Sequence, residues 1–163
     1  MTKFRHGLEV CAANPPEILR GARFGLVMNQ ASIDFRVRAA DEILDESLPG
    51  QLAALVGPQH GAWSEQQDNM IETPHVLDPL RKIPLHSLYA DVQKPTPEML
   101  EGLDVLVVDL QDVGTRVYTY LWTLSLCLEA AAEKGIAVVV LDRPNPLGGD
   151  VFEGPMLNRE FSS

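Results

Sequence analysis

Uninterrupted apolar runs, rather than alternating ones, mark the strands that this sequence predicts. Four such runs lie at residues 24–28, 52–56, 105–108 and 136–141. A strand with no polar side is typical of a parallel sheet whose two faces are both covered by helices. A fifth segment, residues 83–89, could add an edge strand to the same sheet.

Helical spacing lies between these runs. Residues 121–134 give the best pattern, with apolar side chains every three or four positions and Gly135 as a stop signal. Shorter helices are expected at residues 14–20, 37–46 and 96–102. Prolines near the start of such segments and glycines after them set the limits. Strands alternating with helices predict an α/β fold: an open, mostly parallel sheet with helices on both faces.

Composition narrows the classes of protein that fit. The 163 residues suffice for one domain, residues 1–163, at roughly 150 residues per domain. Lys and Arg number 13 and Asp and Glu 23, a net charge of −10. A chain this acidic lacks the basic surface that nucleic acids and anionic membranes attract, so neither is an expected partner. No signal peptide is visible after Met1, and a cytoplasmic protein is therefore expected.

Familiar cofactor and metal signatures do not occur. The chain has no Gly-rich dinucleotide motif, no phosphate-binding P-loop and no serine elbow. Cys11 and Cys127 are too isolated for a disulfide framework or a zinc site, and the four histidines lack metal-ligand spacing. We therefore expect no cofactor and no metal, whereas the Asp side chains and Glu65 keep carboxylate chemistry open.

Polar clusters follow each of the four strand-like runs. They occupy residues 29–30, 57–61, 109–116 and 142–146. In open α/β sheets, ligands bind outside the carboxyl ends of the strands, so the four clusters should converge on one crevice. The segment 57–95 supports this, because a long stretch without helical period inside a domain is usually functional.

Each cluster also has a purely structural interpretation. Asn29 and Gln30 could cap a turn, and His60 could be a buried histidine bonded to backbone. Asp109 and Asp112 could cap the following helix and pair with Arg116. Residues 142–146 could form a rigid turn with an internal Asp–Arg pair. Of Tyr118 and Tyr120, one is expected to pack in the core and the other to lie at the surface. Position at a strand end favours a site but does not name its reaction.

The clusters, in this order, resemble the N-terminal domain of the NamZ-type exo-β-N-acetylmuramidases, a bacterial glycoside hydrolase family long known as a domain of unknown function. The matching stretches are residues 7–10, 25–31, 57–61, 88–89, 94–100, 104–120, 140–149 and 153–155. The resemblance implies a Rossmann-like N-terminal domain, with a C-terminal domain beyond residue 163 that closes the active-site cleft. It also implies release of N-acetylmuramic acid from the non-reducing end of peptidoglycan fragments. The expected ligand is then a cell-wall amino sugar or muropeptide.

One departure from the family pattern concerns Gln59, where the family commonly has a catalytic Glu. A glutamine cannot exchange a proton, and glycoside hydrolysis usually needs two carboxyl groups. Another acid could take over, the substrate could differ, or the protein could bind sugar without cleaving it. The catalytic candidates are His60, Glu65, Asp109 and Asp112. The substrate-binding candidates are Asn29, Gln30, Gln59, Gln111, Arg116, Tyr118, Asp142, Arg143 and Asn145. Of these, Arg116 or Arg143 could bind the lactyl carboxylate of muramic acid.

Overall fold

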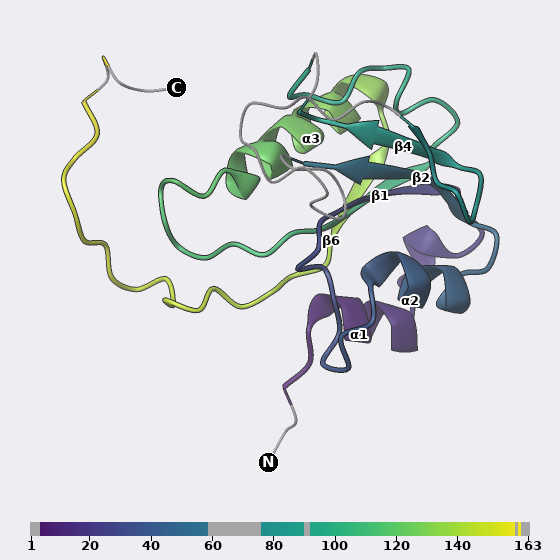
Figure 1. The fold of residues 1–163 in the computed structure, drawn as a ribbon, viewed down its shortest axis with the longest axis horizontal. Coiled ribbons are helices and arrows are strands. Elements are labelled where there is room, and N and C mark those ends of the chain that lie inside the picture. Colours follow the sequence, from purple (N-terminus) through teal and green to yellow (C-terminus); the bar gives the residue numbers. More distant parts are fainter. Residues whose placement is uncertain (1–3, 59–75, 90–91, 159, 161–163) are drawn as a thin grey trace.

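A six-stranded sheet forms the centre of the computed structural model, which describes residues 4–58, 76–89, 92–158 and 160 (Figure 1). Its strands are β1 (Phe24–Met28), β2 (Leu52–Gly57), β3 (Val76–Leu77), β4 (Pro84–Ser87), β5 (Val105–Asp109) and β6 (Ala137–Val140). They lie in the order β3-β4-β2-β1-β5-β6. Every pairing is parallel except that of β3 with β4. The predicted open, mostly parallel sheet is confirmed.

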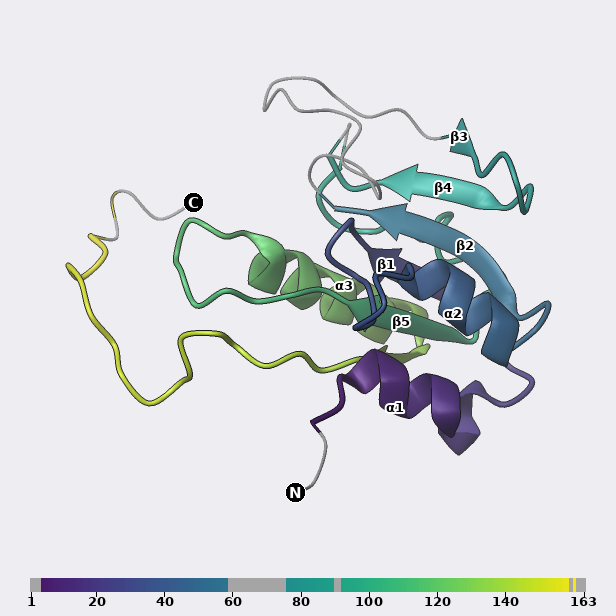
Figure 2. The ribbon, with the colours of Figure 1, turned by 60° about the horizontal axis from the view of Figure 1, so that its bottom comes forward.

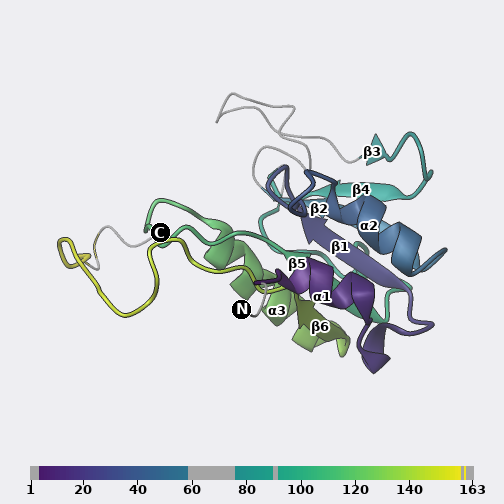
Figure 3. The same cartoon turned by 90° about the horizontal axis from the view of Figure 1, so that it is seen from below.

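Helices cover both faces of this sheet, as the apolar runs predicted. Helices α1 (Gly7–Ala13) and α2 (Ala40–Ser47) lie on one face, and α3 (Tyr120–Lys134) lies on the other (Figures 2 and 3). Successive residues of a strand point to opposite faces, so β1 contributes to two cores. Leu26 packs in the cluster of α1 and α2, and Val27 packs in the cluster of α3. Burying a side chain of this size contributes about 1.5–3 kcal/mol.

The central strands agree closely with the sequence prediction, and so does α2, which was expected at residues 37–46, whereas two other short helices do not. The helix expected at 14–20 is wrong: α1 precedes it, and only one 3-10 turn, Glu17–Leu19, follows the two prolines. Residues 97–102 form turns instead of a helix, because so short a segment gains too few hydrogen bonds to offset helix nucleation. Strand β4 is present, but β3 pairs outside it, so β4 is not the edge.

The order of the strands defines where the chain reverses direction across the sheet. From β1 the chain proceeds to β2 and β4 on one side, and it then returns to β5 and β6 on the other. The switch point therefore lies between β1 and β5, where open α/β sheets bind their ligands. Both strands present their carboxyl ends there, because Met28 pairs with Asp109 in parallel register. Among the described helices, none is long and apolar enough to cross a membrane.

Candidate functional site

A buried ion pair lies at the carboxyl end of β5. Asp109 is the last residue of the strand and is fully buried, and the Arg143 side chain is nearly so. Arg143 Nε donates to Asp109 Oδ1 at 2.5 Å and its terminal nitrogen to Oδ2 at 2.8 Å. The same nitrogen donates to the Ile33 carbonyl at 3.0 Å. The pair therefore joins the segments that follow β1, β5 and β6.

Opposing influences act on the pKa of Asp109. Burial raises it above the ordinary value, because a carboxylate loses water there, and the hydrogen bonds and the charge of Arg143, which lower it, offset only part of that rise. Protonating Asp109 would leave the Arg143 guanidinium buried without its counter-charge. Such an uncompensated charge is costly, so the geometry suits a carboxylate that stays ionised and holds neighbouring loops.

Ser32 connects the end of β1 to Asp109, the acidic member of this pair. The Ser32 hydroxyl donates to the backbone carbonyl oxygen of Asp109 and accepts from the backbone N–H of Asn29 at 3.0 Å. Asn29 Oδ1 accepts from the backbone amide of Ala31 at 3.0 Å, which is an Asx turn. Asn29 is fully buried, and its Nδ2 atom has no hydrogen-bond partner within the part of the chain that the structure describes.

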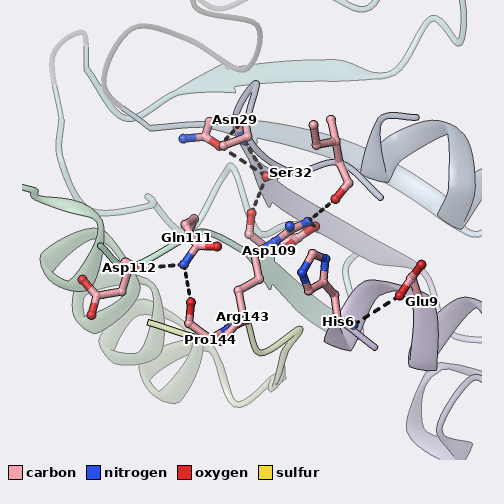
Figure 4. Close-up of polar contacts among 11 residues, drawn as sticks. His6, Glu9, Asn29, Ser32, Asp109, Gln111, Asp112, Arg143 and Pro144 are labelled. Atoms are coloured by element: carbon pink, nitrogen blue, oxygen red, sulfur yellow. Dashed lines mark hydrogen bonds and ion pairs between the residues drawn. The ribbon is translucent and has the colours of Figure 1, made fainter. Parts of the chain in front are cut away.

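The side-chain amides of Gln111 and Asn145 link the loops that follow β5 and β6 by hydrogen bonds. Gln111 Nε2 donates to the carbonyls of Asp112 at 2.6 Å and Pro144 at 2.9 Å (Figure 4). Asn145 Nδ2 donates to Asp112 Oδ2 at 3.1 Å, and the Gly114 amide donates to Oδ1 at 3.1 Å. Among the described residues, Asp112 thus has only neutral partners, unlike Asp109. The Asn145 carboxamide lies where a Cβ on Gly114 would be, so a side chain at 114 would displace it.

Four further predicted residues lie nearer the surface. Arg116 is exposed, and the described residues give it one hydrogen bond, to the Pro155 carbonyl at 3.1 Å. The rings of Tyr118 and Tyr120 pack edge to face, with their centroids 4.6 Å apart. The pKa of Tyr118 is raised, mainly by burial and to a smaller extent by the neighbouring Tyr120. Tyr120 is the buried member of this pair. Asp142 and Gln30 are exposed.

Three predicted residues, Gln59, His60 and Glu65, lie outside the described residues and stay predictions. The structure therefore brings together the clusters after β1, β5 and β6. The fourth cluster begins at Gly57, at the carboxyl end of β2 and beside β1.

Two residues near the site were not among the sequence candidates. Ser32 links β1 to β5, and its place three positions after Asn29, in the polar turn that follows the first strand, is a signal that could have identified it. His6 begins α1, packs its ring 4.3 Å from that of Phe35, and favours the ionised form of Asp109 by its charge. It reaches this position because the Gly7 amide donates to the Asp142 carbonyl at 2.8 Å. Nothing local in the sequence indicates that contact.

Metal and thiol chemistry find little support in the described part of the chain. No three His, Cys, Asp or Glu side chains there lie close enough together to hold a metal ion. Cys11 and Cys127 are buried free thiols. Burial raises the pKa of Cys127 to about 12, so the thiolate needed for nucleophilic attack is scarce at neutral pH.

Comparisons with known proteins agree with this architecture. The family described as "Exo-beta-N-acetylmuramidase NamZ, N-terminal" matches residues 24–163. The peptidoglycan beta-N-acetylmuramidase NamZ of Bacillus subtilis (strain 168) is 42% identical over 161 residues, which are 99% of this chain and 39% of that protein. Two crystal structures of DUF1343 family proteins from Bacteroides fragilis NCTC 9343 are also similar. One has a TM-score of 0.84 and 38% identity over 98% of this chain, and the other 0.75 and 30% over 97%.

The fold and the polar switch point define a doubly wound α/β domain with a candidate ligand site at its carboxyl edge. The chain belongs to the NamZ N-terminal family. It spans 39% of the length of the Bacillus relative and 39% of each of the two Bacteroides structures.

Proposed function

We propose that this chain is the N-terminal part of a glycoside hydrolase that releases N-acetylmuramic acid from the non-reducing end of peptidoglycan fragments. The observation that carries the proposal is the 42% identity to a peptidoglycan beta-N-acetylmuramidase across 99% of the chain. The polar residues gathered at the β1–β5 switch point support it, because a sugar site needs several fixed hydrogen-bonding groups. A C-terminal domain that closes the cleft is part of the same proposal.

The two described aspartates have different roles in this proposal. Asp109 is a positioning residue, because both of its oxygens are bonded to Arg143. Asp112 is the better candidate to contact the substrate, since its partners among the described residues are neutral amides that a substrate could replace. Glu65 is the other carboxylate available for an acid or nucleophile, and two carboxyl groups are what glycoside hydrolysis usually requires.

Arg116 is the better candidate to bind the lactyl carboxylate of muramic acid. Arg143 is buried, and Asp109 already neutralises its charge. Arg116 is exposed, and the described residues give it only a carbonyl partner, so its guanidinium can form a bidentate pair with a carboxylate. Replacement by Gln should weaken N-acetylmuramic acid binding roughly 10- to 100-fold and N-acetylglucosamine binding far less. Equal losses for both sugars would exclude this role.

Product analysis tests the hydrolase proposal itself. The protein expressed from its full reading frame would be incubated with peptidoglycan fragments that end in N-acetylmuramic acid, and the products separated by mass. Free N-acetylmuramic acid should accumulate while the remaining fragment loses one sugar. Release of any other sugar, or of none, would contradict the proposal.

A second function, sugar binding without hydrolysis, is favoured by one observation. Gln59 stands where the family resemblance implies a catalytic Glu, and an amide cannot donate or accept a proton in catalysis. The Gln59→Glu variant separates the two functions. If hydrolysis begins only in the variant, the natural protein is a binding protein. If the natural protein already cleaves, another carboxylate has taken over.

A further inference from the structure

The Asn29 side chain carries an unsatisfied donor at the switch point. Within the described part of the chain, four buried side-chain atoms lack a hydrogen-bond partner: His6 Nδ1, Asn29 Nδ2, Asp41 Oδ1 and Gln51 Oε1. Asn29 alone among these four residues directly follows a strand at the carboxyl edge. Buried polar groups are nearly always paired in native proteins, so an unpaired one at a ligand site indicates a missing partner.

The orientation of this carboxamide follows from its surroundings. Its oxygen accepts from the Ala31 amide at 3.0 Å, and the Ser32 hydroxyl lies 3.4 Å away on the same side. Exchanging the oxygen and nitrogen would set an N–H group against the Ala31 N–H, so the assignment is firm. The nitrogen points away from Ser32 (Figure 4). It can only donate, and its missing partner must be an acceptor.

The chemistry around Asn29 favours a neutral acceptor over an anion. Arg143, the nearest cation in its network, is already neutralised by Asp109. A buried carboxylate would therefore meet no uncompensated positive charge in this network of described residues, and it would lose its hydration. A hydroxyl would also need an acceptor for its own proton, whereas Asn29 Oδ1 already has the Ala31 amide at 3.0 Å and the Ser32 hydroxyl at 3.4 Å. A carbonyl oxygen needs only the donor.

We propose that Asn29 Nδ2 donates a hydrogen bond to the carbonyl oxygen of the 2-acetamido group of the bound sugar, and so distinguishes N-acetylated from free amino sugars. This inference rests on the proposed function. Gln30, the next residue, is exposed, so the turn that holds Asn29 lies at the surface of the carboxyl edge. The free amine of muramic acid is protonated at neutral pH and offers this donor no acceptor.

Two variants isolate the donor from the rest of the turn. Asn29→Asp keeps an oxygen for Ala31 and replaces the N–H group by an acceptor that suits an ammonium. Asn29→Ser also keeps a turn-forming oxygen but removes the amide nitrogen, without adding a buried charge. Asn14→Asp is the matched control, because it makes the same chemical change in an exposed residue whose oxygen bonds Arg20 after the far end of α1.

Dissociation constants of N-acetylmuramic acid and muramic acid would be measured by calorimetry for the full-length protein and each variant, with folding checked by circular dichroism. The natural protein and Asn14→Asp should prefer the acetylated sugar by at least 10-fold. Asn29→Ser should bring the ratio near one, and Asn29→Asp should reverse it. An unchanged ratio in a folded Asn29 variant, or no preference in the natural protein, would overturn the inference alone. If neither sugar binds and no muramic glycoside is cleaved, the proposed function fails and this inference fails with it.

Discussion

Removing Arg143 from the buried pair should destabilise the protein more than any ordinary surface change. Arg143→Met keeps much of the length of the side chain but leaves the Asp109 carboxylate buried without its two charged hydrogen bonds. Breaking a buried ion pair by removing one partner costs about 3–5 kcal/mol. This range already includes the loss of the hydrogen bond to the Ile33 carbonyl, because the same guanidinium makes all three contacts.

Urea unfolding followed by circular dichroism would measure this cost, with linear extrapolation to zero urea. The double variant Asp109→Leu, Arg143→Met should recover a large part of it, because no charge then remains buried. Arg20→Met is the control: Arg20 also pairs with a carboxylate, Glu17, but the two side chains are 54% and 91% exposed. Its removal should change stability little.

Two results would refute this reasoning about the Asp109–Arg143 pair. A loss below about 1 kcal/mol for Arg143→Met would mean that water or another group compensates Asp109. A double variant no more stable than the single one would mean that Arg143 acts through packing and not through charge. Either result would remove the ground for treating Asp109 as a positioning residue.

Three further predictions concern the surrounding structure. Gly7→Ala should lower the thermal midpoint, at a cost of about 1–3 kcal/mol, because a Cβ there overlaps the backbone of Leu141 and Asp142; calorimetry would show it. For Asp34, burial raises the pKa, but hydrogen bonds from two backbone amides and Arg38 outweigh it and lower the pKa overall. Its carboxylate thus stabilises the protein above the pKa of the unfolded state, and this contribution is lost as pH falls through the pKa of the folded state. Asp34→Asn should therefore lower the free energy of unfolding, measured by urea titration, at pH 7 and not at acid pH. Cys127 should resist a thiol reagent at pH 8 until the protein unfolds, because its thiolate is scarce; rapid labelling of the folded protein would contradict this.

The central strands could be predicted because each is buried on both faces and therefore carries its own signal. All five residues of β1 and all five of β5 are buried, and their apolar runs stand out without any knowledge of the partner strands. The short helices were harder. Helix α1 begins where Gly7 meets Asp142, a contact across more than 130 positions of the chain that no local pattern reveals.

The candidate site was predicted as a location rather than as a set of roles. The topological rule placed Asn29, Asp109 and Arg143 at one edge, and the structure brings them together there. It did not predict that Asp109 would pair with Arg143 instead of Arg116, because both arginines lie in clusters at strand ends. Only the burial and hydrogen bonds of the folded chain distinguish the arginine held by a carboxylate from the one left exposed.

Hydrolysis of a chromogenic β-N-acetylmuramic acid glycoside by the protein from the full reading frame tests the central claim most directly, with the corresponding N-acetylglucosamine glycoside as the control. We expect release of the chromophore from the muramic substrate. The kcat/KM for the control should be lower by at least roughly 10-fold, because the control lacks the lactyl carboxylate that a charge-assisted hydrogen bond would recognise. Cleavage of neither glycoside, or equal cleavage of both, would contradict the account.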